Sequence, residues 1–354
     1  MPKQYIKKLP LIGKMSFAKK LLLSVVLVLS VILLIMWVVA MWYKASQSSK
    51  PLQLGVSYIP SYASSLGVDP QKNLDELLNI GVKHLRLTSY WSEGEAKEGH
   101  YDFSQLDWQF QKAEQHNAKI MLSLGLRQPR WPECHIPDWA VNQPADRWQP
   151  QLEDYIKAVV ERYQDSPALQ SYQLENEYFL KGFGTCTNFD RQRLIDEYNL
   201  VKDTDPNHPI IVGRSNNAVG FPVGQPTPDE YSISVYKRVW DAGFSHRYLE
   251  YPFPAWFYGW IAGVQEIFQH RNMMISELQA EAWPPNYKSI PETSLSEQNK
   301  SIDAKRLKDR FKYGEDTGMR QIYLWGGEYW YYRKEVLKDP SLWNVAKQQF
   351  ESIQ

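Results

Sequence analysis

A long apolar run lies near the start of the chain. From Leu21 to Tyr43 it has no charged side chain and consists mostly of Leu, Val, Ile, Met and Trp. As a helix, this run is long enough to cross a hydrocarbon core of about 30 Å. The pattern therefore predicts one transmembrane helix that serves as an uncleaved signal anchor. The alternative is a cleaved secretory signal with Val38-Val39-Ala40 as its cleavage site, but the run exceeds the ~7 to 15 residues usual for such signals.

Beyond Pro51, short apolar segments alternate with segments whose apolar residues recur at spacings of three and four. The first kind predicts buried strands and the second predicts helices. Eight strands alternating with helices over about 300 residues are typical of an α/β fold, the (β/α)₈ TIM barrel. The predicted strands are 53–58, 82–88, 119–124, 169–176, 209–213, 231–236, 272–277 and 321–325, and the predicted helices are 74–80, 106–116, 152–163, 191–202 and 302–313. After strand five, the Gly- and Pro-rich segment 216–227 predicts no helix.

This pattern divides the chain into four parts. Six lysines and no acidic residue precede the apolar run, so the positive-inside rule places the N-terminus in the cytoplasm. The prediction is a basic cytoplasmic tail over 1–20, a transmembrane anchor over 21–43, a short tether over 44–50 and the barrel over 51–354. The barrel is then extracytoplasmic, in a periplasm or at a cell surface.

The charge balance excludes one class of partner. The chain has 40 basic and 40 acidic residues, but residues 1–50 hold eight lysines and no acid. The remainder carries 32 basic against 40 acidic groups, a net charge of about −8. Nucleic-acid binding depends on clustered Lys and Arg. We therefore expect no nucleic-acid partner for the barrel.

The only two cysteines are Cys134 and Cys186. Two are too few for a Cys-rich zinc module or a disulfide scaffold. They follow the adjacent predicted strands three and four, and an oxidising compartment would allow them to form one bridge. We expect this intrachain disulfide, with two free thiols as the alternative.

Polar and aromatic residues gather where the predicted strands end. Two of these ends carry glutamates, in Glu175-Asn176-Glu177 and in Ile275-Ser276-Glu277. In this fold, polar residues at the carboxyl ends of strands form the active site. Two carboxyl groups from separate strands are what glycoside hydrolysis requires. The other residues at or just after these ends are Tyr58, Arg86, Trp91, Arg127, Trp131, Arg214, Asn216, Tyr236 and Trp325.

Four features in barrel order resemble the clan A glycoside hydrolases, the retaining (β/α)₈ enzymes that include families 5, 35, 39 and 42. They are Arg86 followed by Trp91 and Glu98-Gly99-His100-Tyr101-Asp102-Phe103, the Asn176-Glu177 pair, Ile275-Ser276-Glu277, and Trp325 closing strand eight. The nucleophile motif of families 35 and 42 is not reproduced beyond its Glu, and their accessory β-domains are missing. The resemblance therefore does not carry over a substrate.

The resemblance implies a role for each matching residue. Glu177 would be the general acid/base and Glu277 the nucleophile of a double displacement. Asn176 would hydrogen-bond the 2-hydroxyl of the sugar. Arg86 and Tyr236 would orient Glu277 and keep it ionised.

Further residues are candidates for substrate binding. Glu175 either binds a sugar hydroxyl or forms a buried ion pair with Arg86 or Arg127, and Glu281 is expected at the rim or in a subsite. Flat aromatic side chains beside polar groups suit the faces of sugar rings. The aromatic candidates are Trp91, Trp131, Trp283 and Trp325.

The sequence thus predicts a membrane-anchored, extracytoplasmic retaining β-glycosidase that acts on an oligo- or polysaccharide without a metal or cofactor. Two alternatives remain open. One is a barrel of the same lineage that binds glycan at the cell surface without turnover. The other is a transglycosidase that uses the same glutamates.

Overall fold

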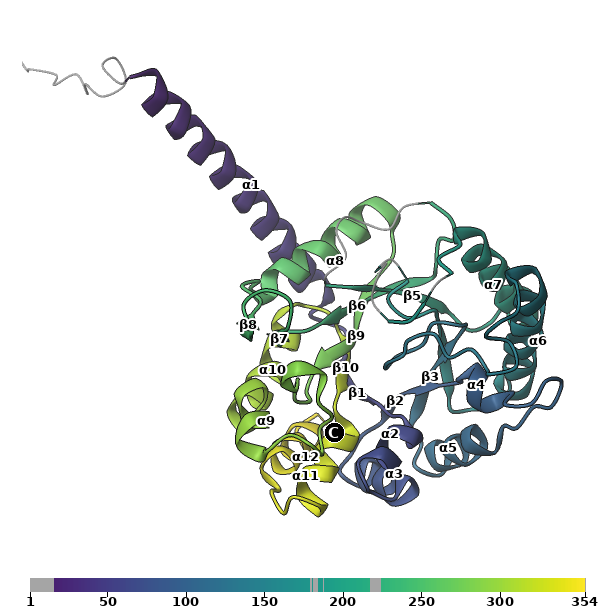
Figure 1. Cartoon of the computed structure of the whole chain (residues 1–354). Helices are drawn as coiled ribbons and strands as arrows, with labels where there is room; N and C mark the ends of the chain where they lie inside the picture. Colours follow the sequence, from purple (N-terminus) through teal and green to yellow (C-terminus); the bar gives the residue numbers. More distant parts are fainter. Residues whose placement is uncertain (1–15, 179, 181–183, 187, 217–223, 354) are drawn as a thin grey trace, which may run out of the picture.

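A computed structural model describes residues 16–178, 180, 184–186, 188–216 and 224–353. Within them, eight parallel strands close into a barrel in the order β1-β10-β9-β6-β5-β4-β3-β2, with helices around the outside (Figure 1). The strands are β1 (Gln53–Ser57), β2 (His84–Thr88), β3 (Lys119–Leu124), β4 (Leu169–Leu174), β5 (Ile210–Ser215), β6 (Glu230–Val235), β9 (Met273–Gln279) and β10 (Gln321–Trp325). The predicted (β/α)₈ fold and all eight predicted strands are confirmed.

The helices cover the barrel with amphipathic faces. In α3, for example, Leu74, Leu77 and Leu78 are buried, and the Asp69 side chain caps the first turn by accepting from the Lys72 amide. The longer helices are α3 (Pro70–Asn79), α5 (Ser104–Gln115), α6 (Ala145–Tyr163), α7 (Arg191–Thr204), α8 (Ala255–Gln269), α10 (Ala304–Asp316) and α12 (Ser341–Glu351). The shorter ones are α2 (Pro60–Ser65), α4 (Trp91–Gly94), η1 (Pro285–Tyr287), α9 (Leu295–Ser301) and α11 (Gly327–Glu335).

Between β6 and β9 the chain departs from a simple alternation. It first forms an antiparallel hairpin of β7 (Arg238–Asp241) and β8 (Arg247–Glu250), and only then α8. The hairpin follows the carboxyl end of β6, so it forms part of the wall above the barrel. After β5, most of the segment 216–227 lies outside the described residues, and its described part contains no helix.

Strand β9 is irregular where it carries its glutamate. Relative to β6, Ile275 pairs with Ile233, but Glu277 pairs with the very next residue, Ser234. One extra residue, Ser276, is therefore accommodated in β9, as in a β-bulge. Such bulges re-aim a side chain and are frequent beside active sites.

The N-terminal helix α1 (Phe17–Gln47) is the one helix in the described part of the chain that is long and apolar enough to span a membrane. Its apolar residues up to Val38 are largely exposed, whereas Ala40, Tyr43 and Gln47 are buried against the barrel domain. The Tyr43 hydroxyl donates to the carbonyl of Met273 over 3.3 Å, at the start of β9.

The segment 44–50, predicted as a short tether, lies partly within α1. Residues 44–47 continue α1, since no helix breaker occurs before Pro51. Lys44 forms an ion pair with Asp316 over 3.0 Å. Figure 1 shows α1 leaving the domain beside α8 as one straight rod.

Candidate active site

A cavity of about 270 Å³ lies at the carboxyl ends of the barrel strands, near the lower end of the range for ligand sites. Both predicted catalytic carboxylates line it. Four residues predicted to bind substrate line it as well. These six residues are Glu177, Glu277, Tyr236, Trp131, Trp283 and Trp325. The barrel thus brings together residues that are up to about 190 positions apart, as its topology requires.

The two glutamates that follow β4 point in different directions. Strand geometry stops at Leu174, and both Glu175 (φ 54°) and Glu177 (φ 44°) adopt left-handed backbone conformations. Non-glycine residues rarely do so, and such strain is concentrated at functional sites. Because the strand alternation is broken here, Glu177 faces the cavity while Glu175 turns toward α7.

Glu277 is held at both carboxylate oxygens. Arg86 Nη1 donates to Oε1 over 2.8 Å, and the Tyr236 hydroxyl donates to Oε2 over 2.7 Å. Burial and the negative charge of Glu277 raise the pKa of Tyr236 well above its ordinary value, so its hydroxyl stays protonated. A permanently charged guanidinium and a phenolic hydroxyl thus each donate to one oxygen of Glu277.

Glu177 has the opposite environment. Burial, followed by the negative charge of Glu277, raises its pKa to about 7. The hydroxyls of Ser234 and Ser215 and the charge of Arg127 act in the other direction but are weaker. One carboxyl group is thus disposed to carry a proton near neutrality while its neighbour is surrounded by donors, the division seen in acid and nucleophile pairs.

Asn176 lies behind these two groups and is buried. Its Oδ1 accepts from Arg86 Nη2 over 2.8 Å and from Gln173 Nε2 over 3.2 Å. The same arginine therefore fixes Asn176 and Glu277. A contact from Asn176 to a sugar hydroxyl stays a prediction.

Glu175 does not contact the cavity. Its carboxylate accepts from the backbone amides of Leu126 and Arg127 and pairs with Arg193 of α7, Nη1 to Oε1, over 2.6 Å. Its predicted role in substrate binding is corrected, since the side chain is fully buried and its oxygens are occupied. The predicted alternative of an ion pair is right in kind, but the partner is Arg193 rather than Arg86 or Arg127.

A glycine makes room for Glu175. Gly125 has φ 100°, and a Cβ there would lie 2.5 Å from Glu175 Oε1. Only glycine combines this backbone conformation with so close an approach. The arrangement ties the loop after β3 to the end of β4 beneath the cavity.

Three of the four predicted aromatic residues lie at the cavity. Trp325 donates from Nε1 to Glu281 over 2.8 Å, Trp283 packs edge-on against Tyr236 at 5.5 Å, and Trp131 is 63% exposed at the rim. The fourth, Trp91, is fully buried. It packs against Trp139 and Trp148 and donates to Glu95, so its predicted contact with substrate is corrected to a role in the core.

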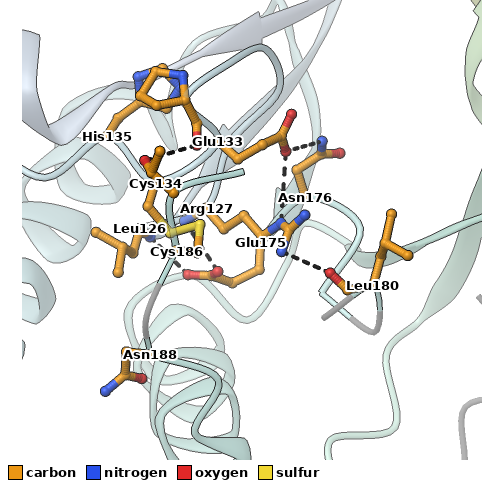
Figure 2. Close-up of a disulfide and its surroundings, with 12 residues drawn as sticks. Leu126, Arg127, Glu133, Cys134, His135, Glu175, Asn176, Leu180, Cys186 and Asn188 are labelled. Atoms are coloured by element: carbon orange, nitrogen blue, oxygen red, sulfur yellow. Dashed lines mark hydrogen bonds and ion pairs between the residues drawn. A yellow bond between two sulfur atoms is a disulfide. The ribbon is translucent and has the colours of Figure 1, made fainter. Parts of the chain in front are cut away.

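Sequence reasoning missed one of the four carboxyl groups that line the cavity, that of Glu133. Its Oε2 accepts from Asn176 Nδ2 over 3.2 Å and lies 3.7 Å from Arg127 Nε. Burial, then the charges of Glu177 and Glu277, raises its pKa to about 8. Figure 2 shows Glu133 reaching toward Asn176 from the chain beside the disulfide. The one feature of the sequence that could have indicated Glu133 is its position next to Cys134.

Sequence reasoning also missed Arg130. It pairs with Glu281 over 3.3 Å, and its guanidinium lies 3.3 Å from the centre of the Tyr62 ring and 4.5 Å from that of Trp325. This pair joins the loop after β3 to the loop after β9. Glu281 thus lines the cavity, in agreement with its expected position at the rim.

The predicted disulfide is confirmed. Cys134 and Cys186 are bonded, with 5.2 Å between their Cα atoms. The bond joins the loops after β3 and β4, and it adjoins Glu133 (Figure 2). It therefore fixes the segment that brings the carboxyl group of Glu133 into the cavity.

Comparison with known proteins finds similarity to enzymes that are named as glycosidases. Residues 58–199 match a family model described as beta-galactosidase, glycoside hydrolase family 42. Mannan endo-1,4-beta-mannosidase F of Aspergillus fumigatus is 29% identical over 119 residues, which are 32% of this chain and 26% of that protein. Mannan endo-1,4-beta-mannosidase A of Podospora anserina is 38% identical over 86 residues, 24% of this chain and 22% of that protein. The matches thus span about a quarter of the length of these relatives.

Solved structures share the fold. A beta-galactosidase from the haloarchaeon Halorubrum lacusprofundi superposes with a TM-score of 0.56 at 14% identity, over 85% of this chain and 58% of that one. A GH10 endoxylanase from a sugarcane soil metagenome gives 0.56 at 13% identity, over 86% and 98%. The family model and the curated relatives support the predicted resemblance to the clan A glycoside hydrolases, and the solved structures share the barrel fold.

Proposed function

We propose that the protein is a membrane-anchored, retaining β-glycosidase in which Glu177 is the general acid/base and Glu277 the nucleophile. The observation that carries the proposal is the unequal treatment of two carboxyl groups in one cavity. Glu277 accepts from Arg86 and Tyr236, whereas burial raises the pKa of Glu177 to about 7. One group can give a proton and the other an electron pair at the same pH.

In the first step, Glu277 attacks the anomeric carbon as the bond to the glycosidic oxygen breaks. Protonated Glu177 gives its proton to that oxygen, so the leaving group departs as a neutral alcohol. The products are a covalent glycosyl-enzyme and an ionised Glu177. The bonds from Arg86 and Tyr236 hold the Glu277 carboxylate in place before the attack.

In the second step, Glu177 takes a proton from water, and the resulting oxygen attacks the anomeric carbon and releases Glu277. Once Glu277 carries the sugar, it has no negative charge. The charge of Glu277 is the second largest cause of the raised pKa of Glu177. That pKa therefore falls in the intermediate, which suits Glu177 to act as a base.

The anchor is part of the proposal. The six lysines before the apolar run, the exposed apolar surface of α1 up to Val38 and the disulfide all support an extracytoplasmic barrel on a retained helix. Ala40, Tyr43 and Gln47 are buried against the barrel domain, so the end of α1 contributes to its packing.

The substrate proposed is a β-linked polysaccharide. The aromatic rim and buried carboxyl groups suit sugar rings and hydroxyls, and the curated relatives are named mannan endo-1,4-beta-mannosidases. We therefore place β-1,4-mannan first, followed by β-1,4-xylan and β-galactosides.

The test is product release by the detergent-solubilised full chain on these polysaccharides and on aryl β-glycosides, compared with Glu277→Gln. The expected result is turnover with retained anomeric configuration by the wild type and a loss of at least ~10³-fold in the variant, because no nucleophile remains. Binding of glycan by both proteins with turnover by neither would instead establish a surface glycan binder.

A further inference from the structure

Helix α8 differs from the other barrel helices in its outward face. Trp256, Trp260, Val264, Ile267 and Phe268 recur at spacings of four, four, three and one residues, so they lie on one side of the helix. Ile267 is 44% exposed and Phe268 is 78% exposed, and the other three are partly exposed. We call these five residues the α8 stripe. Contiguous exposed apolar surface of this kind marks an interaction site.

The outward face of α10 shows what this fold ordinarily presents to water. On that face Lys305 pairs with Asp309, and Lys312 pairs with Asp316. In α8 the only charged residue is Glu266, and it faces α1, where it accepts from Gln47 over 3.0 Å. The α8 stripe therefore has no charged member.

Helix α1 lies directly against α8. A Cβ at Gly263 would lie 2.8 Å from Val39 Cγ1, and one at Gly259 would lie 3.7 Å from Ala40 Cβ. These glycines let the two helices approach closely, and Figure 1 shows α8 crossing α1 at its domain end. The α8 stripe borders this contact face.

The length of the anchor locates the membrane surface. A hydrocarbon core of about 30 Å takes about 20 helical residues, so a span that starts at Leu21 ends near Ala40. Ala40 is the residue that lies against Gly259. Trp37 and Trp42 of α1 are both about half exposed at the same level, as in the aromatic belts of membrane proteins. The bilayer interface therefore reaches α8.

We propose that the α8 stripe inserts into the lipid interface beside α1, so that α8 acts as a second, monotopic membrane contact of the barrel. The partner is the lipid surface itself, and the inference rests on the proposed anchoring by α1. An apolar helix face with aromatic residues, placed in the plane of the interface, is the arrangement that binds such surfaces. The barrel is then held at two places.

The test uses spin labels on single introduced cysteines in the full chain, reconstituted in phosphatidylcholine vesicles with the native disulfide intact. Labels at Phe268→Cys and Ile267→Cys report the α8 stripe, Leu29→Cys reports the middle of α1, and Lys308→Cys reports the aqueous face of α10. Collision rates with oxygen and with a water-soluble nickel complex give the depth of each label. All four positions are exposed, so the labels do not disturb the packing.

We expect oxygen to dominate at Leu29, Ile267 and Phe268, and the nickel complex to dominate at Lys308. If Leu29 is in lipid while Ile267 and Phe268 match Lys308, the α8 stripe faces water and this inference is overturned, with the anchor intact. If Leu29 also matches Lys308, the anchoring itself is wrong and the inference falls with it.

Discussion

Asn176 Nδ2 donates to Glu133 Oε2 over 3.2 Å while Asn176 Oδ1 accepts from Arg86 over 2.8 Å. One amide thus connects the arginine that holds Glu277 with a third buried carboxyl group. Because Arg86 also donates to Glu277, Glu133 is connected to Glu277 through three hydrogen bonds. The disulfide of Cys134, the residue after Glu133, holds the backbone at this point.

Replacing Glu133 by Gln should stabilise the protein at alkaline pH. The pKa of Glu133 is raised from 4.5 to about 8, so between these values the folded state binds more protons than the unfolded state. Stability is therefore lost as pH rises from about 4.5 to about 8. Gln does not titrate. Thermal unfolding should show a midpoint a few degrees above wild type at pH 9, and the difference should vanish near pH 4.5. The exposed Asp138→Asn serves as control, and a gap of equal size at both pH values would contradict the prediction.

The pH dependence of activity should report Glu177. The acid form is needed for bond cleavage and is lost as pH rises through about 7, so kcat/KM on a polysaccharide should fall above that pH. In Glu177→Ala, assayed on a dinitrophenyl glycoside, this alkaline limb should be absent. A limb that persists unchanged in the variant would assign it to another group.

Glu177→Ala should also be rescued by azide. Dinitrophenolate leaves without protonation, so the glycosyl-enzyme still forms, but no base activates water and the intermediate accumulates. Azide attacks without a base, and the product should be a β-glycosyl azide, identified by NMR. Near-normal activity in Glu177→Ala, together with a loss in Glu281→Ala, would refute the assignment.

Arg193→Ala should destabilise the fold by about 3 to 5 kcal/mol, because it leaves Glu175 and Glu197 buried without their shared cation. Urea unfolding measures this. The matched control is Arg162→Ala, whose bond to Asp107 is about half exposed and should contribute less than about 1 kcal/mol. Equal losses in the two variants would show that Glu175 is not held in this way.

Non-reducing mass spectrometry of the protein isolated from its native cells should find the peptides of Cys134 and Cys186 joined. Their separation of 52 residues corresponds to at most about 4 kcal/mol in the chain-entropy model. The double variant Cys134→Ser/Cys186→Ser should therefore unfold at a lower temperature. Two free thiols in the native protein would refute both the bridge and the placement of the barrel in an oxidising compartment.

The barrel could be predicted because each strand is a short apolar segment bounded by turns and followed by a helix of regular apolar spacing. Helix α8 was not predicted from this pattern. Its residues are apolar on nearly every side, since one face meets the barrel, a second meets α1 and a third is the exposed stripe. The β7–β8 hairpin escaped because four-residue strands carry too little pattern.

In the site, residues at strand ends were predictable because parallel strands direct their carboxyl ends to one face. Glu175 and Trp91 were misjudged for local reasons. The left-handed backbone at Glu175 turns its side chain toward α7, and the short helix α4 turns Trp91 into the core. Neither turn follows from strand alternation. Arg130 and Glu133 lie in a loop, where position depends on contacts from distant parts of the chain.

The bond from Tyr43 to the start of β9 has a consequence for how the enzyme searches for substrate. Because α1 stays helical up to Gln47 and its last turns pack on the domain, we expect the barrel to keep one orientation relative to its anchor. Under the proposed anchoring, it keeps one tilt and one height while it diffuses laterally and spins about the membrane normal. The carboxyl ends of the strands, opposite the end that Tyr43 contacts, therefore sweep a thin shell parallel to the bilayer. Under the proposed function, we expect cleavage only of glycan chains that pass through this shell.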